Sequence, residues 1–105
     1  MVIEWLKFKV NPTAREKFIR EDARIWTPVL ASYDGFLGKE VWIEPQIQEN
    51  VNLVIRWQTR QQWKSIPQTV LDTTEQKFAQ AMEENQYQMV ESLEYQVRKF
   101  SHFDR

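Results

Sequence analysis

Residues 36–58, FLGKEVWIEPQIQENVNLVIRWQ, contain two alternating apolar and polar stretches with a polar segment between them. Alternation with a period of two predicts β-strands, here at residues 36–44 and 51–58, joined by a turn at residues 45–50. One helical segment precedes this hairpin and another follows it, so the hairpin fixes the order of the remaining elements. The stretch indicates an α+β chain built around a central antiparallel hairpin.

The chain before the hairpin has the pattern of one strand and one helix. Residues 2–10, VIEWLKFKV, alternate and predict the first strand. Thr13 and Glu16 have the spacing of a capping box, which predicts that a helix begins there. We expect Pro28 to break or kink this helix, because proline lacks an amide hydrogen, and Gly35 to stop it. The expected buried stripe of the helix is Ala14, Phe18, Ile25 and Val29.

The chain after the hairpin repeats this arrangement in reverse order. Thr59 and Gln62 form a second capping box, Pro67 interrupts the short helix that follows, and a longer helix is expected to about residue 85. Its expected buried stripe is Leu71, Thr74, Phe78 and Met82. Residues 89–100 predict the last strand, with inward side chains at Leu93, Tyr95 and Val97.

Strand, helix, hairpin, helix and strand together give the ferredoxin-like β-α-β-β-α-β order. Right-handed crossovers then predict a four-stranded antiparallel sheet in the order 4-1-3-2, with both helices on one face. A chain of 105 residues buries roughly two-thirds of its extended surface on folding, which is enough for one independent core. We therefore expect residues 1–105 to form one domain, with residues 101–105 as a loose tail.

The two faces of this sheet have different expected environments. The helices cover only one face, and the more apolar residues should take it: Leu6, Phe8, Val41, Ile43, Leu53, Ile55 and Trp57. The open face would then present Ile3, Trp5, Trp42 and Val54. Monomers rarely expose such patches, so we expect a homodimer in which a second copy covers this face. The alternative is a monomer whose charged neighbours shield the indoles.

The expected dimer surface includes a charged pair beside the tryptophans. A simple hairpin register puts Trp42 opposite Val54 and Glu40 opposite Arg56, a favourable cross-strand pairing worth roughly 0.2–1 kcal/mol. The predicted interface residues are Trp5, Glu40, Trp42, Val54 and Arg56.

Composition excludes several classes of function. The net charge is −1, from 14 basic and 15 acidic residues without a basic stripe, so we expect no nucleic-acid partner. No apolar run approaches the ~18 residues of a membrane span, and Glu4, Lys7 and Lys9 interrupt the start of the chain, where a secretory signal would be apolar. We expect a cytoplasmic protein with no membrane contact. Without cysteine there is no disulfide, thiolate nucleophile or zinc–sulfur site, and we expect no metal and no cofactor.

Several short motifs resemble those of a known family. Residues 57–63, WQTRQQW, at a strand-to-helix junction resemble the tryptophan-x-Ser/Thr motif of antibiotic-biosynthesis-monooxygenase-like proteins. Residues 34–38, DGFLG, resemble the entry to their second strand. Asp22-Ala23 with Trp26-Thr27-Pro28, and residues 39–42 and 54–57, are similar to an uncharacterised branch of that family. The resemblance covers residues 2 to about 100. It implies a dimeric α+β barrel with a ligand pocket between sheet and helices, lined by the strand-three tryptophan, here Trp57.

The strand directions bring a set of aromatic and acidic residues to one end of the sheet. We expect a ligand pocket between sheet and helices at that end, lined by Glu4, Leu6, Asp22, Trp26, Trp57 and Trp63. The alternative is that the tryptophans simply fill the core, since each buries much apolar area. A cavity of about 300 Å³ or more with convergent polar groups would favour the ligand.

Asp22 is the best candidate for a catalytic group, because it interrupts the apolar stripe of its helix. A buried carboxylate is costly unless it is bonded, so its structural role would be to accept a hydrogen bond from an indole N–H or from Thr27. Its functional role would be that of a general base with a raised pKa, taking a proton from a bound phenol or enol. Glu4 is a second candidate, or a solvated strand end.

The sequence therefore predicts a protein that binds a small hydrophobic or aromatic molecule. The alternative is a cofactor-independent monooxygenase that acts on a small aromatic substrate. Haem degradation fits poorly, because that branch of the family uses an asparagine where Leu6 stands and a histidine on the second long helix. Residues 73–85 contain no histidine, and the single histidine of the chain, His102, falls in the expected tail.

Overall fold

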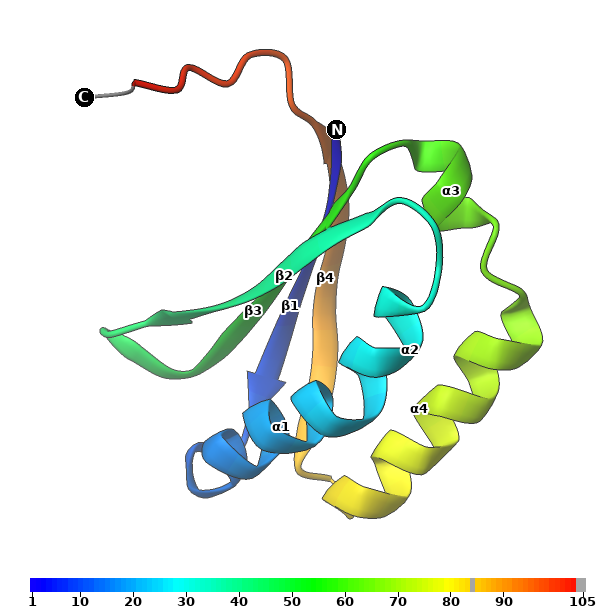
Figure 1. Ribbon diagram of the computed structural model, residues 1–105. Coiled ribbons are helices and arrows are strands. Elements are labelled where there is room, and N and C mark those ends of the chain that lie inside the picture. The colour runs from blue at the N-terminus through cyan, green and yellow to red at the C-terminus, as the bar shows by residue number, and fades with distance from the viewer. Residues whose placement is uncertain (84, 104–105) are drawn as a thin grey trace.

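The computed structural model describes residues 1–83 and 85–103, and it contains one four-stranded sheet (Figure 1). The strands are β1 (Val2–Val10), β2 (Phe36–Glu44), β3 (Ile47–Trp57) and β4 (Tyr87–Gln96). They pair antiparallel in the order β2-β3-β1-β4, which is the predicted order counted from the other edge. The ferredoxin-like α+β fold is confirmed.

The helical segments lie on one face of this sheet (Figure 1). The first crossover contains η1 (Pro12–Ala14), α1 (Arg15–Glu21), η2 (Asp22–Trp26) and α2 (Thr27–Ala31); the second contains α3 (Arg60–Lys64) and α4 (Gln68–Met82). Thr59 caps α3 as predicted, since its hydroxyl oxygen accepts the amide hydrogen of Gln62 at 3.1 Å. The helix α4 ends three residues earlier than predicted.

The first helical segment begins differently from the prediction. The side chain of Asn11, rather than that of Thr13, is the cap, because Asn11 Oδ1 accepts from the Thr13 amide at 3.1 Å. The predicted capping box of Thr13 and Glu16 is therefore wrong. Pro12 occupies the first turn, where its missing N–H costs nothing, and this moves the start of the segment forward to Asn11.

Pro28 does not break the helix. The chain instead passes through the π-helical segment η2, in which the Thr27 amide bonds to the Asp22 carbonyl five residues earlier. The wider turn lets Pro28 fall in the first turn of α2, where no amide donor is needed. It also shifts the buried stripe by one residue, so that Leu30 is buried instead of Val29. Gly35, at φ +92°, then makes the predicted left-handed turn.

The central hairpin is longer than predicted. Its turn is only residues 45–46, and β3 begins at Ile47 because residues 47–50 pair instead of looping. Bulges at both ends of β2 shift the register by two residues, so Val54 lies opposite Glu40 and not opposite Trp42. The predicted Trp42–Val54 and Glu40–Arg56 cross-strand positions are wrong. Arg56 still reaches Glu40 diagonally, with Nε and Oε1 2.8 Å apart.

The core lies between the sheet and the helices. Aromatic rings from three elements meet there, with Phe18 of α1 5.1 Å from Phe8 of β1 and 5.3 Å from Phe78 of α4, centroid to centroid. Thr74, Phe78 and Met82 are the buried face of α4. Val41 and Ile43 face the helix side, as predicted, but remain exposed because the hairpin end extends past the helices (Figure 1).

The last strand changes face along its length. Met89 lies opposite Phe8 on the helix side, whereas Leu93 lies opposite Trp5 and Tyr95 opposite Ile3 on the open side. The prediction that Leu93 and Tyr95 point inward is wrong, because a bulge between Lys7 and Phe8 switches the alternation. Residues 101–103 carry no helix or strand, and residues 104–105 of the expected tail lie outside the described residues.

Candidate functional site

A cavity of about 350 Å³ lies between the sheet and the helices. Apolar side chains from both layers form most of its wall, among them Phe18, Leu53, Ile55 and Phe78. Five of the six residues expected at a pocket line this space: Glu4, Leu6, Asp22, Trp26 and Trp63. The tryptophans therefore do not fill the volume between the layers.

Trp57, the sixth expected pocket residue, lies behind the cavity wall. Its side chain is fully buried and packs edge-on against Phe36, with ring centroids 5.6 Å apart. Its indole Nε1 donates a long hydrogen bond, 3.4 Å, to Oε1 of Glu4. Trp57 thus orients Glu4 instead of facing the cavity itself.

Glu4 is a carboxylate in a largely apolar setting. Burial raises its pKa above the ordinary glutamate value, and the Trp57 hydrogen bond and the charges of Lys39 and Lys64 oppose this rise. Among the residues of the chain that the structure describes, no cation forms an ion pair with Glu4. A raised pKa makes the ionised Glu4 carboxylate a stronger base than an ordinary glutamate.

Asp22 forms a buried ion pair with Lys39 of β2. The Lys39 Nζ lies 2.8 Å from Oδ1 and 2.7 Å from Oδ2, and the two side chains are only 5% and 3% exposed. Burial raises the pKa of Asp22, and the charge and hydrogen bond of Lys39 oppose this rise. The side chain of Asp22 accepts from Lys39, whereas Thr27 Oγ donates to the Asp22 main-chain carbonyl at 3.3 Å.

Lys39 lines the cavity although the sequence did not single it out. A signal was present, because Lys39 lies between Leu37 and Val41 on the face of its strand that was expected to be apolar. Asp22 interrupts the apolar stripe of its helix in the same way. Two opposite charges that each interrupt an apolar face indicate a buried pair, since either charge alone would be costly.

The sheet register places Glu4 and Lys39 in one row across three strands. Ile55 of β3 lies opposite Glu4 on one side and opposite Lys39 on the other. Neighbouring strands are about 4.8 Å apart, so the two backbone positions are separated by roughly 10 Å. All three residues line the cavity, which gives it an apolar floor between an acidic and a basic side chain.

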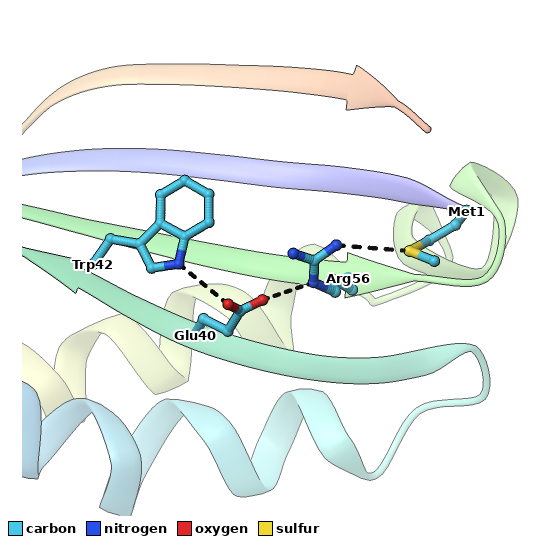
Figure 2. A network of polar contacts seen from close by, with 4 residues as sticks. All are labelled: Met1, Glu40, Trp42 and Arg56. Carbon is cyan, nitrogen blue, oxygen red and sulfur yellow. Dashed lines mark hydrogen bonds and ion pairs between the residues drawn. The ribbon is translucent and has the colours of Figure 1, made fainter. Parts of the chain in front are cut away.

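The open face carries a polar network around Trp42 (Figure 2). Trp42 Nε1 donates to Glu40 at 3.2 Å, Arg56 Nε donates to the same carboxylate at 2.8 Å, and Arg56 Nη1 lies 4.0 Å from the sulfur of Met1. Trp42 as a whole residue remains 45% exposed. The charged groups therefore fix the indole without covering it.

Two of the four apolar residues expected to be exposed on this face are already buried within one chain. Val54 is 1% and Ile3 9% exposed. Beside them, Asn52 is buried, and within residues 1–83 and 85–103 its Oδ1 has no hydrogen-bond partner. A buried oxygen of this kind is typically satisfied by a further donor.

Among the described residues there is neither a metal-ligand cluster nor a membrane-spanning helix. No group of three or more histidine, cysteine, aspartate or glutamate side chains among them is arranged to hold a metal ion. No helix in the described chain has the length and apolar character needed to cross a bilayer. His102 lies near the end of the described chain, where its ring stacks on Phe100 with centroids 6.4 Å apart.

Several solved structures share this fold. The cofactor-independent oxygenase SnoaB from Streptomyces nogalater superposes with a TM-score of 0.69 over 94% of each chain, at 16% identity. The haem degrader MhuD from Mycobacterium tuberculosis, solved with two haems in its active site, gives 0.68 over 97% of this chain and 100% of that one, also at 16% identity. A conserved protein from Methanosarcina mazei gives 0.64 over 92% of each chain, at 12% identity.

Sequence comparison points the same way. No curated protein matches the sequence. A model of the antibiotic biosynthesis monooxygenase family matches residues 1–69, which span the chain from β1 into α4 and include Glu4, Asp22, Lys39 and Trp57. The chain belongs to the antibiotic biosynthesis monooxygenase family.

Proposed function

We propose that the protein binds a small hydrophobic or aromatic molecule in the cavity between sheet and helices. The observation that carries this proposal is a space of about 350 Å³ with mostly apolar walls and a few convergent polar groups, Glu4 and the Asp22–Lys39 pair among them. Ligand sites in proteins are typically concave and mostly apolar, with a small number of placed polar groups. Trp26 and Trp63 supply flat surfaces against which an aromatic ring stacks.

A binding screen with a matched pair of variants tests this proposal. Mono- and bicyclic aromatic compounds are titrated against the protein by isothermal calorimetry. Leu6→Phe adds volume at the cavity wall, and Leu37→Phe makes the same change at an exposed position outside the cavity lining. We expect Leu6→Phe to weaken binding at least tenfold and Leu37→Phe to leave it unchanged. Equal loss in both variants, or no binding by any compound, would contradict the proposal.

The second candidate function is cofactor-independent oxygenation of a small aromatic substrate. The observation that favours it is Glu4, a half-buried carboxylate with a raised pKa at an apolar cavity, because such chemistry begins with proton removal from an electron-rich substrate. Asp22, the base expected from the sequence, is held by Lys39 and serves this role less well. Oxygen uptake with aromatic hydroquinones, lost in Glu4→Gln and retained in Glu91→Gln, is the expected result.

Haem is not proposed as a partner of this cavity. Histidine, cysteine and tyrosine are the usual single ligands of haem iron. None of the three is among the described residues that line the cavity, and Leu6 supplies an apolar side chain there.

We also propose that two copies associate through their open sheet faces. Trp5, Trp42, Leu93 and Tyr95 share that face and are at least partly exposed, which is more apolar surface than a monomer usually shows in one place. The Oδ1 of Asn52 on the same face supports this, because a partner would supply the donor that a single copy does not. A twofold interface is the commonest way to bury such a patch.

A further inference from the structure

The charges of the cavity wall do not balance. Five charged side chains line the cavity: Glu4, Asp22, Lys39, Lys64 and Glu75. Asp22 and Lys39 neutralise each other in their buried pair, and Glu75 is exposed to solvent. Within residues 1–83 and 85–103, no ion pair reaches Glu4. The cavity therefore has an excess of negative charge, and its half-buried carboxylate is Glu4.

Two indoles lie at the same end of the cavity as Glu4. Trp26 and Trp63 line the cavity and pack against the buried cluster that contains Ile55 and Trp57. Both of these cluster residues adjoin Glu4, since Ile55 lies directly opposite it in the sheet and Trp57 donates the 3.4 Å hydrogen bond to it. The face of an indole attracts cations, because its π electrons carry negative charge. This end of the cavity thus combines aromatic faces with a carboxylate.

The chain itself places an ammonium group on one of these indoles. Lys64, the last residue of α3, is exposed, and its Nζ lies 4.1 Å from the centroid of the Trp63 ring. The helix α3 lies at the Glu4 end of the sheet (Figure 1), because Arg60 pairs with Glu94, which is directly opposite Glu4. The charge of Lys64 acts on Glu4 and opposes the rise that burial causes in its pKa. A cation is therefore already accommodated between an aromatic face and this carboxylate.

The other end of the cavity is lined by aromatic rings. Glu4, Leu6 and Phe8 follow one another along the helix side of β1, with about 13 Å between the first and last Cα atoms. Phe18 packs there against Phe8 and Phe78, with ring centroids 5.1 Å and 5.3 Å apart. A ligand that lies along the cavity meets a carboxylate at one end and phenylalanine rings at the other.

We propose that the cavity binds an aromatic molecule that carries a protonated amine, with its ammonium group held between Glu4 and the indole faces of Trp26 and Trp63. The ring of the ligand lies toward the phenylalanines. Lys64 occupies the ammonium position in the free protein and moves toward solvent when the ligand binds. No covalent bond forms or breaks. This inference rests on the proposed ligand site and names its ligand class.

Charge distinguishes this class from other ligands of the same shape. An ammonium group brings the counter-charge that Glu4 lacks, in a setting where a low dielectric strengthens the attraction. A carboxylate on the same chain would bring a further negative charge toward Glu4. An alcohol brings no charge, so its affinity should fall between the two.

Three ligands of matched length test the inference. 3-Phenylpropylamine, 3-phenylpropan-1-ol and 3-phenylpropanoate are titrated against the protein by calorimetry at neutral pH, where the amine is protonated. We expect the amine to bind at least tenfold more tightly than the alcohol, and the carboxylate to bind most weakly. If the alcohol binds as tightly as the amine, the ligand site stands and the inference is overturned.

A matched pair of variants tests the role of Glu4. Glu4→Gln removes the charge and keeps an oxygen for the Trp57 indole. It is expected to lower the ratio of amine to alcohol affinity at least tenfold, and binding of the alcohol reports that the cavity is intact. Glu91→Gln removes a carboxylate from the open face, outside the cavity lining, and should keep the wild-type ratio. A wild-type ratio in Glu4→Gln would refute the assignment to Glu4.

A second pair tests the competing ammonium group. Lys64→Met is expected to raise the affinity for the amine at least threefold, because the ligand no longer displaces Lys64 from the Trp63 ring. Lys77→Met removes the same charge from an exposed position of α4 outside the cavity lining and should bind the amine as the wild type does. Equal amine affinity in all three proteins would contradict the role given to Lys64. If neither these three ligands nor any other aromatic compound binds, the proposed function fails, and the inference fails with it.

Discussion

The Asp22–Lys39 pair shows how single residues set the properties of this cavity. Removing two charges from water is expensive, and their mutual attraction compensates only when the geometry is close, as it is here at 2.7 and 2.8 Å. The presence of this ion pair is therefore weak evidence that the pair as a whole stabilises the fold. Each member is nevertheless indispensable to the other, since either charge alone would be buried without compensation.

Lys39→Met is expected to lower the free energy of unfolding by about 3–5 kcal/mol, because it leaves the Asp22 carboxylate buried and unpaired. The double change Asp22→Asn with Lys39→Met should recover most of this loss, since no buried charge remains. Urea denaturation at neutral pH measures both values. A double variant as unstable as Lys39→Met alone would show that the ion pair is not the cause.

Glu4 should make stability depend on pH in the opposite sense to a paired carboxylate. Its pKa is raised in the folded state mainly by burial, against opposing contributions from Trp57, Lys39 and Lys64. The native state therefore binds this proton more tightly than the unfolded state, and the penalty for ionising Glu4 grows as pH rises above 4.5. Glu94 of β4 is the carboxylate directly opposite Glu4 in the sheet, and its own ion pair is with Arg60, with Nε and Oε2 3.0 Å apart.

Glu4→Gln is accordingly expected to be more stable than the wild type at neutral and mildly alkaline pH. The difference should disappear as pH falls below 4.5, where Glu4 is protonated in both states. Thermal unfolding of the two proteins across this range provides the measurement. A Glu4→Gln protein that is less stable at every pH would show that Glu4 is stabilised by its contacts rather than penalised by burial.

At the scale of elements, the sequence predicted the features that follow from local patterns. It missed the features that depend on bulges in the strands. The four strands, the cap at Thr59 and the turn at Gly35 follow from alternation, capping chemistry and glycine geometry, all of which are local. The two-residue register shift at Glu40 and Val54 depends on bulges, which leave no clear periodic signal. The reversed face of Leu93 has the same origin.

The candidate site was predictable to a similar extent. Glu4 and Asp22 stood out as charges within apolar patterns, and strand directions placed them at one end of the sheet. The role of Lys39 was missed because its partner Asp22 lies 17 residues away on a different element, and no local pattern connects the two. Trp57 was expected to line the cavity, but its ring packs against Phe36 and its indole bonds to Glu4, which alternation along a strand does not reveal.

The start of the first helical segment provides a test at this scale. Asn11→Ala is expected to lower the free energy of unfolding by about 1 kcal/mol, because the Thr13 amide then loses its cap. Thr13→Ala, at the position that the capping-box pattern favoured, should cost less, since its hydroxyl only donates to Asn11. Chemical denaturation of both variants decides between the two caps. A larger loss of unfolding free energy for Thr13→Ala than for Asn11→Ala would contradict the structure.

The whole molecule is a two-layer structure with one sheet face left uncovered. The helices cover one face (Figure 1), and the opposite face carries Trp5 and the exposed Trp42 with its polar network (Figure 2). The relatives that share this fold cover almost the same length, so the layers are common to them, whereas the residues in the cavity are those of this chain. Identities near 16% support likeness of fold alone.

The proposed dimer makes a prediction at this largest scale. Light scattering at micromolar concentration should give twice the mass of one chain. Trp42→Lys is expected to raise the dissociation constant at least thirtyfold, about 2 kcal/mol, as for a buried aromatic anchor. Ile43→Lys is the matched control, since Ile43 is the next residue of β2, is similarly exposed at 47%, and points to the other face. A wild-type protein with the mass of one chain would exclude the dimer.

The extra residue in η2 has a practical consequence for protein engineering. A helical wheel drawn with 3.6 residues per turn through the first crossover assigns Val29 to the interior and leaves Leu30 outside, but the molecule buries Leu30. A mutant library whose pocket positions after Trp26 were chosen from such a wheel would vary the wrong side of α2. A transfer of this crossover to another scaffold must keep the π-turn at Asp22–Trp26. An ideal helix of the same length would turn Leu30 away from the cavity.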